Sequence, residues 1–278
     1  MVVMKKRVIS AAILIALAVT CVFLSRLSRV LFFAVCGMLC AYELSKNFEK
    51  LDARCTLWVM VAYLLSASAV AVFYSLYIID LSQTISLTLV LFIAAVYTAL
   101  FSGIIHEKVS GKGALYTVAG ICYPCVLFVA LMLISVSDIW ISALCVGCIS
   151  SWMCDAFALF GGKRFGKHKV APRISPAKTV EGCISGALSS IVAGIFIYFV
   201  IFPLYDAPYS LFYTLAAALI SSTMGQIGDL AESMLKRLIG VKDFSNLIPG
   251  HGGMFDRADS LLFSIPTAFF LLRLYELI

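Results

Sequence analysis

The chain alternates long apolar runs with short polar connections. A helix needs about 20 apolar residues to cross a hydrocarbon layer about 30 Å thick, and nine segments of the sequence are long enough. They are residues 8–24, 27–45, 55–77, 81–105, 114–136, 139–160, 182–202, 209–230 and 260–278. Because these runs take up most of the chain, the pattern predicts an all-α, polytopic integral membrane protein with a single transmembrane domain over residues 1–278.

Composition agrees with that prediction. Hydrophobic residues make up 62% of the chain and charged residues 13%, whereas soluble domains contain about 45–50% apolar residues. The first run also has the charged start and apolar middle of a signal peptide. No small-residue cleavage site follows it, so we interpret residues 8–24 as the first span.

The basic residues predict an orientation. If the N-terminus is cytoplasmic, 18 of the 21 lysines and arginines fall in the inside segments, as the positive-inside rule requires. The exceptions are Arg26, Arg29 and Arg273. We therefore expect a cytoplasmic N-terminus. The net charge of +6 then reflects topology, and we expect no nucleic-acid partner.

Two C-x-x-C pairs, Cys122 with Cys125 and Cys145 with Cys148, have a spacing that also occurs in zinc and redox sites. Both pairs lie in apolar runs without a nearby histidine. Buried thiols behave as small hydrophobic groups, so we interpret these cysteines as packing residues.

Polar residues concentrate in the C-terminal half, about 139–278, in two long inside segments at 161–181 and 231–259. Asp155 lies within the sixth run, where a charge costs about 2.5–3.5 kcal/mol. It must therefore face water or the protein interior, where it either serves a site or bridges two helices. Asp229 is predicted to end the eighth span, and Glu232, Ser233 and Lys236 share its helical face.

Asp256 and Asp259 begin the last run three positions apart. Each could simply stabilise a helix N-terminus. Together with Asp229, however, they form an oxygen-only set that suits Mg²⁺ better than zinc, if the three converge at one depth. Whether a second, monovalent cation shares such a site stays open.

Cationic and glycine-rich segments accompany these acids. The basic candidates for holding polyanionic phosphates are Lys178, Lys236, Arg237, Lys242 and Arg257. Pro249, Gly250, Gly252 and Gly253 surround His251 in a loop whose backbone N–H groups could bind a phosphate. His251 itself is a candidate phosphate contact, a candidate general base or a structural residue. Such a set is typical of phosphoryl or nucleotidyl transfer.

The stretch SMLKRLIGVKDFSNLIPGHGGMFDRAD, residues 233–259, resembles the signature of the bacterial CDP-diacylglycerol synthases, also called phosphatidate cytidylyltransferases. It contains the S-x-x-K-R, K-D, P-x-H-G-G and D-R-x-D elements of that signature. Residues 154–182 are similar to a second polar segment of the family, with F-G-K and I-S-P-x-K-T-x-E-G. Ala258 departs from the pattern, because the family usually has a larger apolar residue there.

The resemblance implies transfer of the cytidylyl group of CTP to phosphatidate, giving CDP-diacylglycerol and pyrophosphate. It implies Mg²⁺ held by Asp229, Asp256 and Asp259, and a substrate loop containing Ser175, Pro176 and Lys178. The catalytic candidates are Asp229, Asp256, Asp259, Lys178, Lys236 and Arg237. The substrate-binding candidates are Ser175, Pro176, Thr179, Glu181, Asp155, Lys242, His251, Gly252, Gly253 and Arg257.

We expect the site on the cytoplasmic side of the bacterial plasma membrane, where CTP from water meets phosphatidate in the inner leaflet. As a hypothesis, a phosphatidate oxygen attacks the α-phosphorus of CTP in line. Two other interpretations remain: a CTP-dependent lipid kinase, which moves the γ-phosphate, and a transporter, since intramembrane acids also mark ion paths. The choice between CTP and dCTP, and between a monomer and a homodimer, also stays open.

Overall fold

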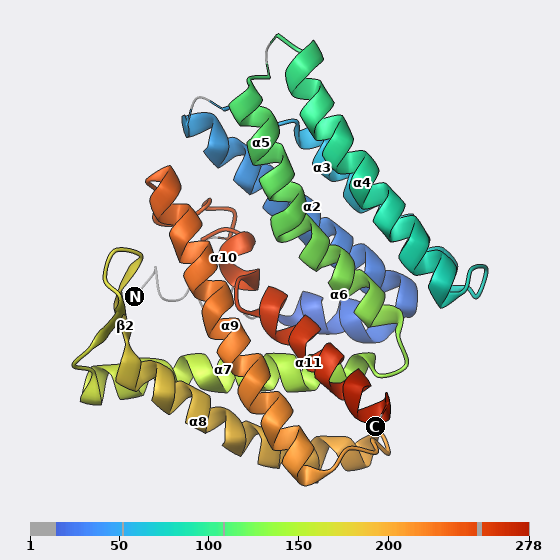
Figure 1. Cartoon of the computed structure of the whole chain (residues 1–278). Coiled ribbons are helices and arrows are strands. Elements are labelled where there is room, and N and C mark those ends of the chain that lie inside the picture. Colours follow the sequence, from blue (N-terminus) through green and yellow to red (C-terminus); the bar gives the residue numbers. More distant parts are fainter. Residues whose placement is uncertain (1–14, 52, 108, 249–251, 278) are drawn as a thin grey trace. The chain divides into compact units, whose positions relative to one another are not determined.

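A computed structural model describes residues 15–51, 53–107, 109–248 and 252–277, and helices dominate it (Figure 1). Eight helices within these ranges are long and apolar enough to cross a membrane, and a shorter apolar helix covers Ile15–Leu24. The all-α, polytopic prediction is therefore confirmed. Of the first predicted span, residues 8–14 lie outside the described residues.

The spans follow the predicted order. The main helices are α2 (Arg26–Phe48), α3 (Leu57–Ser75), α4 (Leu81–Ile105), α5 (Gly111–Gly120), α6 (Val126–Val136), α7 (Trp140–Phe165), α8 (Val180–Phe196), α9 (Leu211–Ile239), α10 (Phe255–Ala258) and α11 (Leu261–Leu277). Helices α5 and α6 form a single span, joined by a π-helical turn over Ile121–Cys125. Short π and 3-10 turns also follow α2 and α8, over Glu49–Leu51, Ile197–Ile201 and Phe202–Leu204.

The chain divides into two compact units, each assembled from two separate stretches of sequence. The first contains residues up to Val136 together with Ile239–Arg257, and the second contains Ser137–Leu238 together with Ala258–Ile278. The first unit buries Leu44, Met60, Leu64, Ile121 and Met132 in its core, and the second buries Ile197, Leu262, Ile265 and Leu272. Both units therefore have an apolar core of their own, and the single transmembrane domain stays a prediction.

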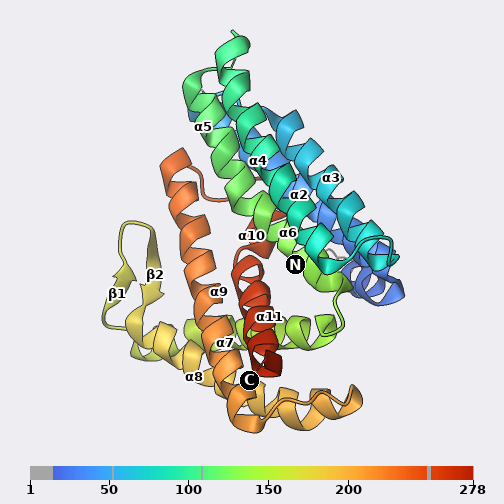
Figure 2. The same ribbon diagram turned by 45° about the vertical axis from the view of Figure 1, so that its right-hand side comes forward.

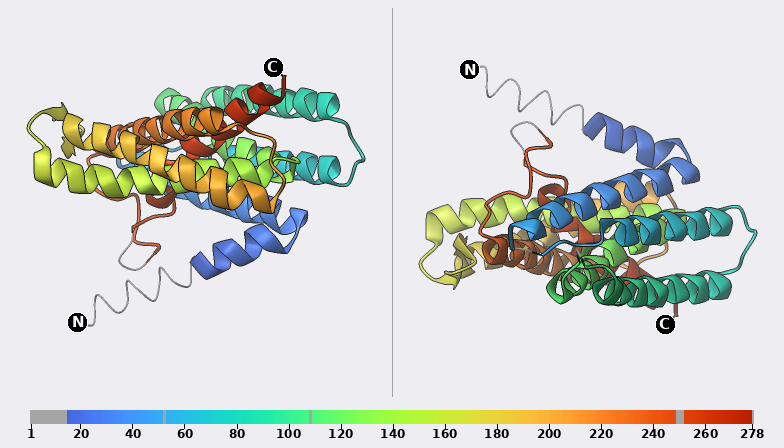
Figure 3. Two further views of the ribbon diagram at one scale, coloured as in Figure 1. Left: turned by 90° about the horizontal axis from the view of Figure 1, so that it is seen from below. Right: turned by 90° about the horizontal axis from the view of Figure 1, so that it is seen from above.

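In the second unit, α7 and α8 run side by side (Figure 3). Glycines make this close approach possible. A Cβ added at Gly182 would lie 2.8 Å from the carbonyl oxygen of Ala158, and one at Gly186 would lie 2.6 Å from that of Cys154. Small residues let helix backbones pack closely in membranes, and this glycine pair brings α8 directly against α7.

The segment between α7 and α8 forms a two-stranded antiparallel hairpin, visible in Figure 2. Strands β1 (Lys169–Ala171) and β2 (Ser175–Thr179) pair Lys169 with Thr179 and Ala171 with Ser175. Pro172 and Pro176 exclude a continuous helix through this segment. The strand pairing itself has no apolar alternation that would have predicted it.

Two of the arginines that depart from the positive-inside pattern, Arg29 and Arg273, interact with polar groups of the protein. Arg29 on α2 donates to the carbonyl oxygens of Ser135 and Val22. Arg273 on α11 pairs with Asp138 and Glu276. The hydrogen bonds from Arg273 lower the pKa of Asp138. Such pairing is the usual condition for an arginine within a membrane span.

All ten cysteines carry free thiols. Those of the two C-x-x-C pairs are not joined by disulfides, and Cys125 is completely buried. Burial agrees with the packing interpretation for Cys125, whereas Cys122 is exposed and Cys145 and Cys148 are partly exposed, so for these three it stays a prediction.

Candidate active site

Helix α9 carries the central acidic face of the second unit. It continues to Ile239, so Asp229 lies a third of the way from its C-terminal end and does not end the span as predicted. Asp229 and Glu232, three positions apart, lie on one face of the helix. Glu232 is fully buried and forms an ion pair with Lys236, while Asp229 pairs with Lys178 of β2 at 2.5 Å.

Asp259 approaches this face from the start of the last span. The helix there is interrupted, and Asp259 lies in the turn between α10 and α11, where its Oδ1 accepts a hydrogen bond from the backbone N–H of Ser260 at 2.7 Å. Gly228 on α9 makes room for that turn, because a Cβ at Gly228 would lie 2.6 Å from the carbonyl oxygen of Asp259.

The result is a cluster of three carboxylates. One oxygen each from Asp229, Glu232 and Asp259 lies within 4.8 Å of the others. Oxygen-only sets of this kind suit hard divalent cations such as Mg²⁺. The predicted convergence of Asp229 with Asp259 is thus present within one unit, and Glu232 joins them. From the sequence, Glu232 is expected on the same helical face as Asp229, but it was not predicted as a ligand.

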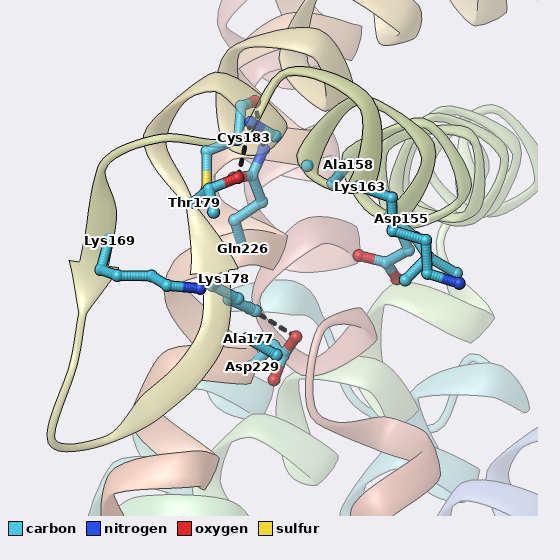
Figure 4. Close-up of a pocket in the computed structure, with 14 residues that line it drawn as sticks. Asp155, Ala158, Lys163, Lys169, Ala177, Lys178, Thr179, Cys183, Gln226 and Asp229 are labelled. Carbon is cyan, nitrogen blue, oxygen red and sulfur yellow. Dashed lines mark hydrogen bonds and ion pairs between the residues drawn. The ribbon is translucent and has the colours of Figure 1, made fainter.

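A cavity of about 360 Å³ lies beside Asp229. Figure 4 shows the side chains around it: Asp155 and Lys163 belong to α7, and Lys169 and Lys178 extend from the hairpin towards Asp229. The side chain of Asp155 is exposed and lines the cavity, in agreement with the requirement that it face water or protein.

Other residues of the cavity wall had not been predicted. Those with polar or sulfur-containing side chains are Lys163, Lys169, Cys183 and Gln226. The amide of Gln226 on α9 donates to the carbonyl oxygen of Cys183 at 3.2 Å and contacts the sulfur of Cys154 at 2.9 Å. Gln226 precedes Asp229 by three positions, a helical spacing that could have drawn attention to it.

Glu181 and Arg237 contact the hairpin. The carboxylate of Glu181 accepts hydrogen bonds from the backbone N–H groups of Lys167 and His168 and pairs with the ring of His168 at 2.6 Å. Arg237 donates through Nε to the carbonyl oxygen of Ile174 at 3.1 Å. These contacts fix both ends of the hairpin that carries Lys178, and a direct substrate contact by Glu181 or Arg237 stays a prediction.

Thr179 ends β2 and caps α8, because its hydroxyl accepts a hydrogen bond from the backbone N–H of Gly182 at 3.2 Å. Ser175 is half-buried and Pro176 is exposed on β2. Thr179 also lines the cavity. The predicted substrate loop is thus the strand β2 followed by the first turn of α8.

The remaining predicted residues belong to the first unit. Oδ2 of Asp256 accepts hydrogen bonds from the backbone N–H groups of Phe244 at 3.0 Å and Gly253 at 2.8 Å. Gly252 has φ +85, a conformation that glycine adopts without strain. Lys242 and Arg257 are exposed. His251 lies outside the described residues.

Comparison with known proteins gives one consistent result. The chain matches the model of the cytidylyltransferase family over residues 5–275. A protein of Thermotoga maritima named phosphatidate cytidylyltransferase is 31% identical over 275 residues, which cover 98% of this chain and 97% of that protein. Proteins with the same name from Bacillus subtilis and Staphylococcus aureus are 44% identical over 129 residues and 45% identical over 116 residues. These two alignments span 46% and 43% of the relatives' lengths.

Proposed function

The chain belongs to the cytidylyltransferase family, and we propose that it transfers the cytidylyl group of CTP to phosphatidate, giving CDP-diacylglycerol and pyrophosphate. The observation that carries the proposal is the Asp229–Lys178 pair, which links the three-carboxylate cluster to the cavity between α7, α9 and the hairpin. The full-length similarity to a protein named phosphatidate cytidylyltransferase supports this choice of substrates.

Asp229, Glu232 and Asp259 would hold Mg²⁺, with Asp256 kept as a predicted ligand on the strength of the family resemblance. When bound, Mg²⁺ neutralises charge on the nucleotide phosphates. The fit rests on the donor chemistry, because all three clustered side chains offer carboxylate oxygens within 4.8 Å of one another. Glu232 is fully buried among them.

Lysines of the cavity wall and of the neighbouring carboxylate cluster would bind the phosphates of the two substrates. Lys178 is held at Asp229 and Lys236 at Glu232, so both ammonium groups are already directed to the cluster. Lys163 and Lys169 add two further positive charges at the cavity wall. Charge neutralisation of this kind provides most of the catalysis in phosphoryl-group transfer, which demands little covalent chemistry from the protein.

We place the site at the cytoplasmic edge of the plasma membrane, because a lipid phosphate reaches only headgroup depth and CTP arrives from water. The dense basic segment before α8 supports this orientation under the positive-inside rule.

The test uses the purified full chain in detergent with phosphatidate, Mg²⁺ and CTP labelled at either the α- or the γ-phosphorus. We expect label from α-labelled CTP in the lipid and label from γ-labelled CTP in pyrophosphate. Lipid labelled only from the γ-position would instead identify a kinase. Replacing CTP by dCTP in the same assay measures nucleotide choice.

A further inference from the structure

A buried glutamate on α2 holds the glycine-rich loop of the first unit. Glu43 is only 3% exposed and lies within a helix long and apolar enough to span a membrane. An ionised group in such a position is costly unless other groups hydrogen-bond to it. Its surroundings therefore indicate what it does.

Both carboxylate oxygens of Glu43 accept hydrogen bonds from the segment 245–255. Oε1 accepts from the hydroxyl of Ser245 at 2.6 Å and from the backbone N–H of Met254 at 2.9 Å. Oε2 accepts from the backbone N–H of Phe255 at 3.0 Å. Hydrogen bonds to a charged acceptor are roughly twice as strong as those between neutral groups.

The fit between Glu43 and the loop depends on a glycine. A Cβ added at Gly253 would lie 2.6 Å from one oxygen of Glu43 and 2.7 Å from the other. Gly253 therefore allows the loop backbone to lie directly against the carboxylate. This gives a physical reason for the second glycine of the H-G-G element, in addition to any contact with substrate.

Asn47, one helical turn after Glu43, extends the same contact. Its amide donates to the carbonyl oxygen of Phe244 at 2.7 Å and to that of Glu43 at 2.7 Å. Phe244 and Phe255 are both buried and their rings lie 4.9 Å apart. The loop is thus fixed at both of its ends to one face of α2.

The loop also wraps around Asp256, whose Oδ2 accepts from the backbone N–H groups of Phe244 and Gly253. Two carboxylates therefore hold adjacent parts of one short segment. Moving Glu43 would change the backbone at Met254 and Phe255, directly before Asp256.

We propose that Glu43 is a positioning residue for the cytidylyl transfer: it fixes the chain at Ser245, Met254 and Phe255, and through these residues the orientation of Asp256, without touching substrate. The link to catalysis rests on the proposed function. The link to loop geometry does not, and the two are tested separately.

The first measurement compares steady-state kinetics of wild type, Glu43→Gln and the control Glu49→Gln. Glu49 is an exposed acid just after the end of α2. An amide at position 43 replaces one acceptor oxygen by a donor that faces backbone N–H groups. We expect kcat to fall about 10- to 100-fold, the range typical of a displaced reacting geometry, with KM for CTP and phosphatidate nearly unchanged. The control should keep wild-type kcat.

The second measurement is amide hydrogen exchange of the same three proteins. Glu43→Gln should accelerate exchange in peptides covering 244–256 and leave α3 and α4 unchanged, which a general loss of stability would not do. Wild-type kcat together with wild-type exchange of the loop in Glu43→Gln would overturn the proposal. If wild type forms no CDP-diacylglycerol, the proposed function fails, and the exchange result alone decides whether Glu43 holds the loop.

Ser245→Ala supplies the same test if Glu43→Gln does not fold. It removes the hydroxyl that donates to Glu43 from the half-buried side chain of Ser245. It should lower kcat about 3- to 10-fold, the range that corresponds to the loss of one hydrogen bond of ordinary net strength. Faster loop exchange should accompany the loss. Unchanged kcat and exchange in this folded variant would count against the proposal.

Discussion

The side chain of Glu232 is fully buried. It forms an ion pair with Lys236, one helical turn further along α9. A buried ion pair contributes little net stability, because desolvation offsets most of the attraction. The carboxylates of Asp229 and Asp259 lie close to Glu232 as well. Three acids that close together repel one another, and a divalent cation is the simplest way to relieve that repulsion.

We therefore predict that Glu232→Gln raises the Mg²⁺ concentration needed for half-maximal activity about 10- to 100-fold, as loss of a metal-site residue typically does. The measurement is a Mg²⁺ titration of CDP-diacylglycerol formation. Glu107→Gln, at an exposed acid of the first unit, is the matched control. An unchanged Mg²⁺ requirement in a variant with wild-type thermal stability would remove Glu232 from the ligand set.

At the scale of elements, the contact between α7 and α8 sets the wall of the cavity. Gly186 faces the carbonyl oxygen of Cys154, and Asp155 is the next residue of α7. The backbone separation of the two helices therefore affects where Asp155 lies relative to Lys178, which belongs to β2 directly before α8. Packing of small residues, and not the acids themselves, fixes that distance.

Gly186→Ala should lower the midpoint of thermal unfolding in detergent by several degrees, since overpacking a helix contact costs about 1–3 kcal/mol. Gly111→Ala is the control, because a Cβ at Gly111 meets nothing within 4 Å. Equal unfolding midpoints for the two variants would show that α7 and α8 accommodate the added methyl group without loss of stability.

For the whole molecule, the charge distribution predicts which side each connection occupies. The turn with Asp206 has no basic residue, whereas the sequence between α4 and α5 contains Lys108, and Lys112 is the second residue of α5. Arg273, the exception within the last span, pairs with Asp138 and Glu276, so its position does not argue against this orientation.

Fusions of alkaline phosphatase, which is active only outside the cytoplasm, test the orientation. A fusion after Asp206 should be active and a fusion after Gly111 inactive. Fluorescent-protein fusions at the same sites should show the opposite pattern. Activity of the fusion after Gly111 would invert the predicted topology and place the hairpin on the outer side.

The sequence alone was sufficient for the spans, because partition of a helix into a bilayer depends on the length and polarity of a local run. Helix α4 has the predicted bounds of 81–105. The predicted end of the eighth span, at residue 230, was wrong, because α9 continues to Ile239. The polar face from Asp229 to Lys236 lowers the hydropathy of this segment without interrupting the helix. Asp229 and Asp259 were identifiable as acids at the edges of apolar runs.

The tertiary structure decided which groups meet. Glu232 became a member of the acidic cluster only through the turn at Asp259, and Ser245 contacts Glu43 across 202 positions of sequence. In the sequence, Glu43 is one acid near the end of an apolar run, with nothing to indicate a partner. Hydropathy is a property of neighbours along the chain, whereas a hydrogen bond between distant segments depends on how helices and loops pack, and for that reason only the folded chain reveals it.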